Sequence, residues 1–150
     1  MANSSTLDLV APLSGYLVPI EQVPDPVFAQ KLVGDGISLD PTSTTLKAPC
    51  AGEVMHIHPA AHALTIKSAI GLEVMMHIGL DTVKLRGEGF AAKVKVGDNV
   101  KAGDELIEFN GDLVAQEARS LLTQIVVTNS DLLEAVVYGS GSVVEGESVI

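Results

Sequence analysis

The feature that most constrains this chain is the alternation of short apolar runs with turn-forming residues along its whole length. The runs are separated by Gly, Pro, Asp and Asn, and the chain holds 14 Gly and 7 Pro. Such punctuation is typical of short β-strands joined by tight turns. Strands are expected at 7–10, 15–20, 52–57, 63–66, 72–78, 105–109, 124–127 and 142–150. We therefore predict an all-β fold, an antiparallel β-sandwich or barrel-like structure.

Helical patterning is confined to brief pieces. They are expected at 27–32, at 113–121 after a cap at Asp112, and at 132–137 after Ser130 or Asp131. Only a few short helical turns should therefore accompany the sheets.

A short pattern, Ala-Pro-x-x-Gly, occurs at 11–15 and again at 48–52, each time just before an expected strand. In both copies Pro opens a turn that Gly completes. The repeat predicts quasi-symmetric strand pairing. The segment 96–106 also resembles the hairpin of lipoyl and biotinyl carrier domains, which are β-sandwiches. Lys101 lacks the flanking residues of their attachment lysine, so no attached cofactor is expected.

A chain of 150 residues is long enough for one domain with a core of its own. We expect a single domain at 7–150 after a disordered or tag-derived N-terminus at 1–6. No apolar run approaches the roughly 18 residues that suggest a membrane span, and 1–6 lacks the features of a secretory signal. The one cysteine, Cys50, cannot form an internal disulfide and should serve packing. The expected compartment is the cytoplasm.

The net charge is −10, from 19 acidic and 9 basic side chains, and no cluster of Lys and Arg stands out. Nucleic-acid binding needs a basic face, so that function is excluded. An acidic surface favours a basic protein partner through steering of the encounter. The alternative is that the charge mainly keeps the protein soluble.

The segment 73–78 alternates with the period of a β-strand. One face carries Val74, Met76 and Ile78, and the other carries Glu73, Met75 and His77. His77 should therefore point away from the core, and Gly79 leaves room for a close backbone approach beside its ring. A histidine at a strand end can equally be a satisfied structural residue.

The segment 71–90 resembles the active-site signature of the glucose-type enzyme IIA domains of the bacterial phosphoenolpyruvate:sugar phosphotransferase system. The resemblance rests on Gly71 and on the run His77-Ile78-Gly79-Leu80-Asp81-Thr82-Val83. Further matches follow in family order at 11–15, 23–25, 27–29, 33–36, 48–49, 62–63, 84–90 and 139–141. They cover nearly the whole chain, so the resemblance is specific.

The resemblance implies a phosphocarrier. His77 would accept a phosphoryl group from the histidine phosphocarrier protein HPr and pass it to a cysteine of a sugar permease IIB domain, in the glucose or N-acetylglucosamine branch. In the family the second histidine, matching His62, lies beside the first on an adjacent strand. A backbone carbonyl at the position of Gly79 orients the nucleophile, and the aspartate matching Asp81 sits beside it. A neutral ring can attack phosphorus when its other nitrogen is held by an acceptor.

Strand parity makes a different prediction for His62. Simple alternation would place it with Leu64 and Ile66 on the core side, whereas a twisted or bulged strand end would turn it toward His77. The family also commonly has a threonine two residues before this histidine and an aromatic residue four before it. These positions hold Ala60 and His58 here, which weakens the expected hydrogen-bond support of His62.

Metal binding is the main alternative chemistry. The run of His56, His58 and His62 resembles a strand-borne metal site, although exposed strand histidines without a metal are also common. In some regulatory complexes of the family, zinc lies between the two histidines and a partner's carboxylate, which here would involve His62 and His77. The alternative function is thus a regulatory or zinc-binding interaction module. Phosphotransfer itself should require no cofactor.

The resemblance also implies a docking surface. Phe28, Val33 and Met75 match or neighbour an apolar collar, and Asp25 adds acidic charge for HPr, while core packing is the alternative. Core packing is expected for the neighbouring Ile78. Regulatory targets are further candidate partners, and no direct insertion into a membrane is expected. Because the chain stops on Val149-Ile150 without a charged tail, we expect an excised domain of a longer fused polypeptide of enzyme IIA, HPr and enzyme I.

Overall fold

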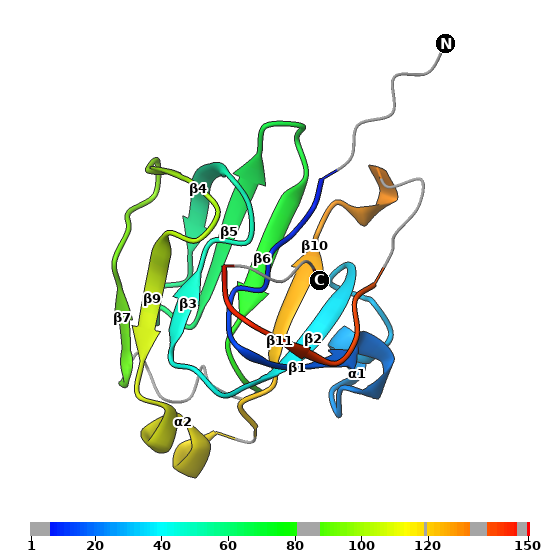
Figure 1. The fold of residues 1–150 in the computed structure, drawn as a ribbon, viewed down its shortest axis with the longest axis vertical. Coiled ribbons are helices and arrows are strands. Elements are labelled where there is room, and N and C mark those ends of the chain that lie inside the picture. Colours follow the sequence, from blue (N-terminus) through cyan, green and yellow to red (C-terminus); the bar gives the residue numbers. More distant parts are fainter. Residues whose placement is uncertain (1–6, 81–87, 119, 133–137, 147–149) are drawn as a thin grey trace.

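The structure, a computed structural model, describes residues 7–80, 88–118, 120–132, 138–146 and 150. Its strands form two antiparallel sheets (Figure 1). The eight-stranded sheet has the order β11 (Ser142–Val143), β1 (Gly15–Pro19), β2 (Asp35–Pro41), β10 (Thr123–Val127), β6 (Glu73–His77), β5 (Ala63–Ser68), β4 (Gly52–Ile57), β8 (Asn99–Val100). The three-stranded sheet has the order β3 (Thr45–Lys47), β9 (Glu105–Phe109), β7 (Phe90–Ala92). The predicted all-β, antiparallel architecture is confirmed.

The main core lies between the two sheets. Leu64, Val74 and Met76 of the larger sheet and Leu46 and Leu106 of the smaller one are all fully buried in one cluster. Each of these side chains comes from the inward face of an alternating strand. Burying a side chain of this size contributes about 1.5–3 kcal/mol, so this cluster holds the two sheets together.

The eight-stranded sheet is quasi-symmetric about its central pair, β10 and β6. Going outward from that pair, β2 and β5, β1 and β4, and β11 and β8 occupy matching places. Hydrogen bonds between the two Ala-Pro-x-x-Gly turns repeat the relation, because Val10 N–H donates to the Pro49 carbonyl and Lys47 N–H donates to the Pro12 carbonyl. The quasi-symmetric pairing expected from the repeat is therefore present.

The glycine that ends each repeat starts a strand between two neighbours. Gly15 pairs with Pro41 and Val143, and Gly52 pairs with Ser68 and Val100. A Cβ atom on Gly15 would lie 2.1 Å from the Asp40 carbonyl oxygen, and one on Gly52 would lie 2.4 Å from that of Lys67. Only a residue without a side chain fits either place.

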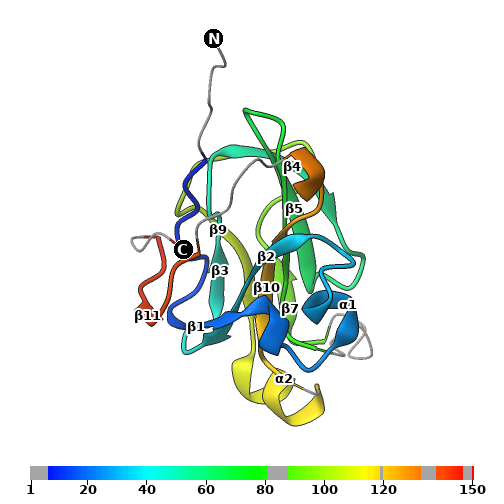
Figure 2. The ribbon, with the colours of Figure 1, turned by 90° about the vertical axis from the view of Figure 1, so that its right-hand side faces the viewer.

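The helices are short and begin earlier than the sequence suggests. Helix α1 (Pro26–Ala29) starts after an Asp25 cap, whereas 27–32 was expected. Helix α2 (Gly111–Glu117) is capped by Asn110, so the expected cap at Asp112 and end at 121 are wrong. The Asn110 side chain already accepts from the Leu113 N–H, which moves the start forward. Figure 1 shows α1 on the right and α2 at the lower left, and in Figure 2 both lie in the lower half of the molecule.

Two 3-10 turns complete the described helical structure, η1 (Ile20–Gln22) and η3 (Ser130–Leu132). The first ends the strand expected at 15–20 one residue early. The second coincides with the start expected for the third helix, whose remaining positions at 133–137 lie outside the described residues. None of the helices in the described part of the chain has the length and apolar character that crossing a membrane requires.

The remaining strand predictions differ mainly at the chain ends. Residues 7–9 form no strand, and the last strand covers only Ser142–Val143, with 147–149 outside the described residues. Strand β2 was missed because its sequence, DGISLDP, carries turn-forming residues inside a strand. A Cβ on Gly36 would lie 1.9 Å from the Ile125 carbonyl oxygen, so this glycine permits the close approach of β10.

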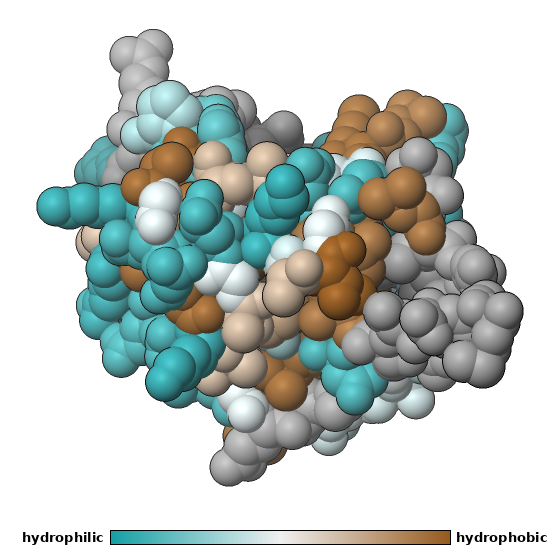
Figure 3. Space-filling model, turned by 90° about the horizontal axis from the view of Figure 1, so that it is seen from above, coloured by the Kyte–Doolittle hydropathy of each residue, from teal (hydrophilic) through white to brown (hydrophobic). Residues whose placement is uncertain are grey.

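Exposed apolar side chains are scattered over the described surface. Ile70, Val96 and Leu132 are among those at least partly open to solvent. Figure 3, a view of one side, shows brown apolar patches separated by teal hydrophilic groups. On that side, the apolar surface is divided among small areas.

Candidate active site

His77 is the last residue of β6, and its strand alternates as the sequence predicts. Val74 and Met76 are fully buried, whereas Glu73, Met75 and His77 are half-buried on the other face. The side chain of His77 therefore stands on the sheet face opposite the main core. It is presented at a strand end, as expected.

The turn after His77 fixes its ring. His77 Nδ1 and the Gly79 carbonyl oxygen are 2.9 Å apart, so Nδ1–H donates to this carbonyl. Gly79 adopts φ 73°, a conformation that favours glycine, and Leu80 N–H then donates to the Ser120 carbonyl. This bond selects the tautomer that leaves Nε2 unprotonated, with its lone pair free.

His62 lies beside His77, across the β5–β6 ladder. Ala63 pairs with His77, and the Ile78 N–H donates to the His62 carbonyl. The His62 side chain is 2% exposed, yet its ring centroid is 4.9 Å from that of His77, with the ring planes at 77°. His62 is buried, but it meets the ring of His77 instead of pointing with Leu64 and Ile66, so the twisted strand end describes it and simple alternation does not; the backbone turns at Ala61, with φ 61°.

The turn between β4 and β5 brings a third histidine to the site. His58 N–H donates to the Ala63 carbonyl, and Ala61 N–H donates to the His58 carbonyl. The ring is tied down as well, because Ala60 N–H donates to His58 Nδ1 over 3.0 Å. The centroids of the His58 and His62 rings are 4.3 Å apart, at 48°.

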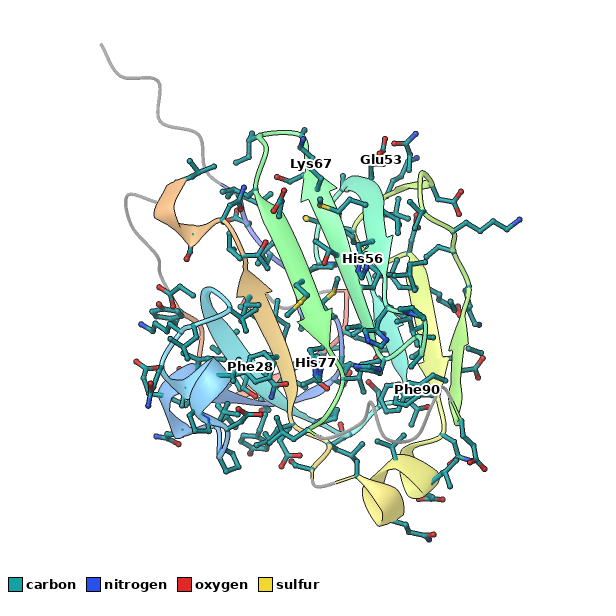
Figure 4. All side chains as sticks on the ribbon, turned by 180° about the vertical axis from the view of Figure 1, so that it is seen from behind. Phe28, Glu53, His56, Lys67, His77 and Phe90 are labelled. Atoms are coloured by element: carbon teal, nitrogen blue, oxygen red, sulfur yellow. The ribbon has the colours of Figure 1, made fainter. Side chains whose placement is uncertain are left out.

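Two phenylalanine rings flank the histidine pair. The Phe28 centroid is 5.3 Å from that of His77, and the Phe90 centroid is 6.2 Å from that of His62. Figure 4 shows Phe28 and His77 next to each other, Phe90 on the other side of His77, and His56 apart from them along β4. Phe90 was not among the expected site residues, although it ends the family-like stretch 84–90.

Burial keeps both histidines neutral. It lowers the pKa of His62 to about 4, with further lowering from His77 and His58. Burial also lowers the pKa of His77, an effect opposed first by the hydrogen bond to Gly79 and then by the nearby charge of Asp25. At neutral pH the site therefore presents two uncharged imidazoles, and His77 has its lone pair at Nε2.

The hydrogen-bond support of His62 is incomplete, as the alanine at position 60 predicts. Its Nδ1 is buried and has no hydrogen-bond partner among the described residues. An unpaired buried N–H is rarer than an unpaired buried acceptor, so the favoured tautomer carries its proton on Nε2.

The four expected docking residues gather beside the site but differ in exposure. Phe28 is 6% exposed and packs with Ile20, Val23, Leu80 and Val126, which favours the core-packing alternative, and a docking role for it stays a prediction. Val33 and Met75 are half-buried against the same cluster. Asp25 caps α1 by accepting from the Val27 N–H over 3.0 Å. Ile78 is fully buried, as expected.

The histidine run does not assemble into a metal site within the described residues, where no group of three or more His, Cys, Asp or Glu side chains is placed to hold an ion. His56 is exposed, and only His58 reaches His62. His62 and His77 could supply two nitrogens to zinc, which takes four ligands, so the others would have to come from a partner or water. Zinc binding stays a prediction.

Asp81, expected beside His77, lies outside the described residues. Gln124 was missed: it pairs directly with His77 across β10 and β6, is fully buried, and leaves its Oε1 without a partner in the described structure. The sequence signal for Gln124 was a polar residue inside an apolar strand.

Cys50 is buried, and burial raises the pKa of its thiol to about 11. A thiol that stays protonated is a poor nucleophile, which agrees with a packing role.

Comparison with known proteins decides what this geometry belongs to. Residues 7–133 match the family described as the phosphoenolpyruvate-dependent sugar phosphotransferase system, EIIA 1. This chain belongs to that family. The suspected membership is therefore confirmed. Members of this family are phosphotransferase components that carry phosphoryl groups for sugar uptake.

Several curated relatives support the same assignment, each described as the glucose-specific EIIA component of the phosphotransferase system. The one from Halalkalibacterium halodurans is 51% identical over 83% of this chain and 72% of its own. Those from Bacillus cereus and Staphylococcus aureus are 47% and 43% identical, over 85% and 95% of this chain and 78% and 86% of theirs.

A solved structure, the glucose permease IIA from Mycoplasma capricolum, has the same fold. It superposes with a TM-score of 0.88 at 35% identity, over 95% of this chain and 93% of that one. The chain is thus a phosphocarrier domain of the enzyme IIA type, and the comparisons give no support to a separate regulatory or zinc-binding module.

Proposed function

We propose that His77 is the residue that carries the phosphoryl group. The observation that carries this proposal is the 2.9 Å bond from His77 Nδ1–H to the Gly79 carbonyl, because it orients the ring and leaves the Nε2 lone pair free. The lowered pKa of His77 adds to this, since the ring is neutral and nucleophilic at pH 7.

Acceptance is an in-line displacement at phosphorus. The His77 Nε2 lone pair attacks the phosphoryl group on the histidine of HPr, the bond from phosphorus to that histidine breaks, and its electron pair returns to the donor ring. Donation repeats the chemistry in the other direction. A cysteine thiolate of a IIB domain attacks the same phosphorus, and the bond to His77 Nε2 breaks.

His62 serves the transfer as a hydrogen-bond donor. The tautomer with its proton on Nε2 presents an N–H beside the phosphorylated ring, where it would stabilise charge on the phosphoryl oxygens. Because that charge is redistributed when the bond to His77 breaks, this donor matters most when the group leaves. Asp81 would limit how stably the phosphate is held.

The partners follow from the same assignment. HPr would be the donor and a glucose-type IIB domain the acceptor, because the curated relatives are described as glucose-specific. Val33 and Met75 supply apolar contacts at the site, and both pack against the cluster that contains Phe28. Asp25 adds to the acidic charge that steers a basic donor. The reaction takes place in the cytoplasm. It needs no cofactor, and zinc enters only at a partner interface.

The test compares His77→Gln with His62→Gln in a phosphotransfer chain of phosphoenolpyruvate, enzyme I and HPr. His77→Gln should incorporate no phosphate. His62→Gln should accept it from HPr as an acid-labile phosphohistidine, yet donate it to a IIB domain at least about a hundredfold more slowly, the effect of losing one positioned donor. His56→Gln, an exposed histidine on β4, is the matched control.

Phosphate retained by His77→Gln would place the acceptor elsewhere. Equal loss of acceptance in both variants would show that His62 is not specific to donation. A IIB domain from an N-acetylglucosamine permease, used in parallel, tests the sugar branch, because faster transfer to it than to the glucose-type domain would overturn the proposed glucose branch.

A further inference from the structure

The ring of His58 occupies a constrained position against the site. Its backbone closes the β4–β5 hairpin through the bond to the Ala63 carbonyl, and its Nδ1 accepts the Ala60 N–H inside the turn. The ring therefore has little freedom to rotate. It is half-buried, and it stands 4.3 Å from the ring of His62, centroid to centroid.

The ring of His62, by contrast, is held by no hydrogen bond at Nδ1 among the described residues. Buried polar atoms are usually fixed by such bonds, so at Nδ1 the orientation of this ring depends on packing and not on a hydrogen bond. Three other rings lie around His62: His58 at 4.3 Å, His77 at 4.9 Å and Phe90 at 6.2 Å, centroid to centroid. Of these, His58 has the smallest ring-to-ring separation.

We propose that His58 is a positioning residue for His62: tied to the turn through Ala60, its ring packs on the His62 ring and holds it in the orientation that meets His77. The packing of one fixed ring against another, tilted by 48°, takes the place of the hydrogen bond that His62 Nδ1 lacks among the described residues. The role rests on the proposed function of His62 as the donor that assists phosphoryl release. It predicts a defect in donation, because acceptance does not depend on that N–H.

A second interpretation is that His58 only shapes the turn. Its Nδ1 bond to Ala60 would then be the important contact, and the ring itself would be dispensable. The two roles can be separated by substitution. Asn retains a side-chain oxygen that can accept the Ala60 N–H in the same kind of turn, but it has no ring. Phe retains a ring that can pack on His62, but it cannot accept that N–H.

The experiment measures phosphoryl acceptance from HPr and donation to a IIB domain for wild type, His58→Phe and His58→Asn. With His58→Asn we expect donation to slow ten- to hundredfold, roughly the cost of a misplaced catalytic group, while acceptance is unchanged. His58→Phe should donate nearly as fast as wild type. His56→Asn, an exposed histidine on the same strand, should leave both steps unchanged.

A readout without phosphate keeps this proposal separate from the function on which it rests. Proton–nitrogen correlation spectra of the His62 ring report its tautomer and orientation in the unphosphorylated domain. One ordered ring form is expected in wild type and His58→Phe, and a mixture in His58→Asn. Should His58→Asn fail to fold, His58→Ala replaces it as the variant without a ring.

Each result decides the matter. Slow donation in His58→Phe, with normal donation in His58→Asn, would show that the turn and not the ring is important. An unchanged His62 spectrum in all variants would also overturn the proposal. A third result separates the two proposals. If the wild type takes up no phosphate on His77, the phosphocarrier assignment of His77 is contradicted. If the His62 spectra of wild type and His58→Asn still differ as expected, the contact between the rings is nevertheless established.

Discussion

The chemistry of the site depends on which ring nitrogens find partners. His77 Nδ1 has the Gly79 carbonyl and His62 Nδ1 has none among the described residues, so the first ring keeps a lone pair at Nε2 and the second a proton. The sequence could predict the face of His77, because period two assigns it. Alternation alone could not predict the approach of His62 to 4.9 Å, which depends on the register of β5 against β6 and on the positive φ of Ala61; only the family resemblance implied it.

The buried state of His62 predicts how stability depends on pH. Its pKa is about 4 in the folded protein and close to 6.5 when unfolded, so between these values the unfolded chain binds more protons. Stability is therefore complete above about pH 6.5 and is lost as the pH falls toward 4. Going from pH 7 to pH 5, wild type should lose about 2 kcal/mol more than His62→Gln, which has no titrating ring.

Urea unfolding of both proteins at the two pH values measures this difference. If wild type and His62→Gln lose the same stability between pH 7 and pH 5, within experimental error, the folded protein protonates His62 as readily as the unfolded chain does. His56→Gln, which removes an exposed histidine on β4, serves as the reference for the substitution itself.

At the scale of elements, two connections build the site. The long link between β1 and β2 contains η1 and α1, whose Phe28 packs against His77, and the short turn between β4 and β5 carries His58 and His62. The strands with clear alternation, such as β6, could be predicted, whereas β2 could not. Its Gly36 is required by the close approach of β10, and glycine inside a short segment resembles a turn.

Helix α1 provides a test of packing against docking. Phe28 is 6% exposed in a small cluster that includes Val126, so Phe28→Ala should lower the free energy of unfolding by about 3 kcal/mol. Val27→Ala on the same helix, 45% exposed, should change it by less than about 0.5 kcal/mol. Thermal or urea unfolding measures both. A Phe28→Ala variant as stable as wild type, yet weak in binding HPr, would restore this residue to the docking surface.

At the scale of the molecule, the sequence predicted that the two Ala-Pro-x-x-Gly repeats have similar structures, but it could not predict the hydrogen bonds between them. The pairing of turn with turn joins residues far apart in the sequence, and the strands between them depend on contacts that no local pattern contains. The family resemblance, in contrast, could be identified because its motifs keep their order along the chain.

Gly15 and Gly52 occupy equivalent positions, so replacing either should reduce stability by a similar amount. Gly15→Ala and Gly52→Ala each force a Cβ against a backbone carbonyl, so each should destabilise the fold by about 3 kcal/mol or more. Gly97→Ala is the control: its φ of 97° strains alanine, but nothing lies within 4 Å of the added atom, and about 1 kcal/mol is expected. Denaturant unfolding of the three variants measures the differences. A tolerant Gly15 beside an intolerant Gly52 would show that the halves are not mechanically equivalent.

The quasi-symmetric sheet has a further consequence for where the chemistry stands. Gln124 pairs with His77 and Val126 pairs with Met75, so exchanging β10 for β6 puts Val126 in the place of His77. Ile20, Val23 and Phe28 pack over Val126 and bury it. His77, at the corresponding position of the other half, is only half-buried. The two halves of the sheet therefore differ in what covers them: the long link between β1 and β2 shields the inert position, and the short turn between β4 and β5 leaves the reactive one accessible.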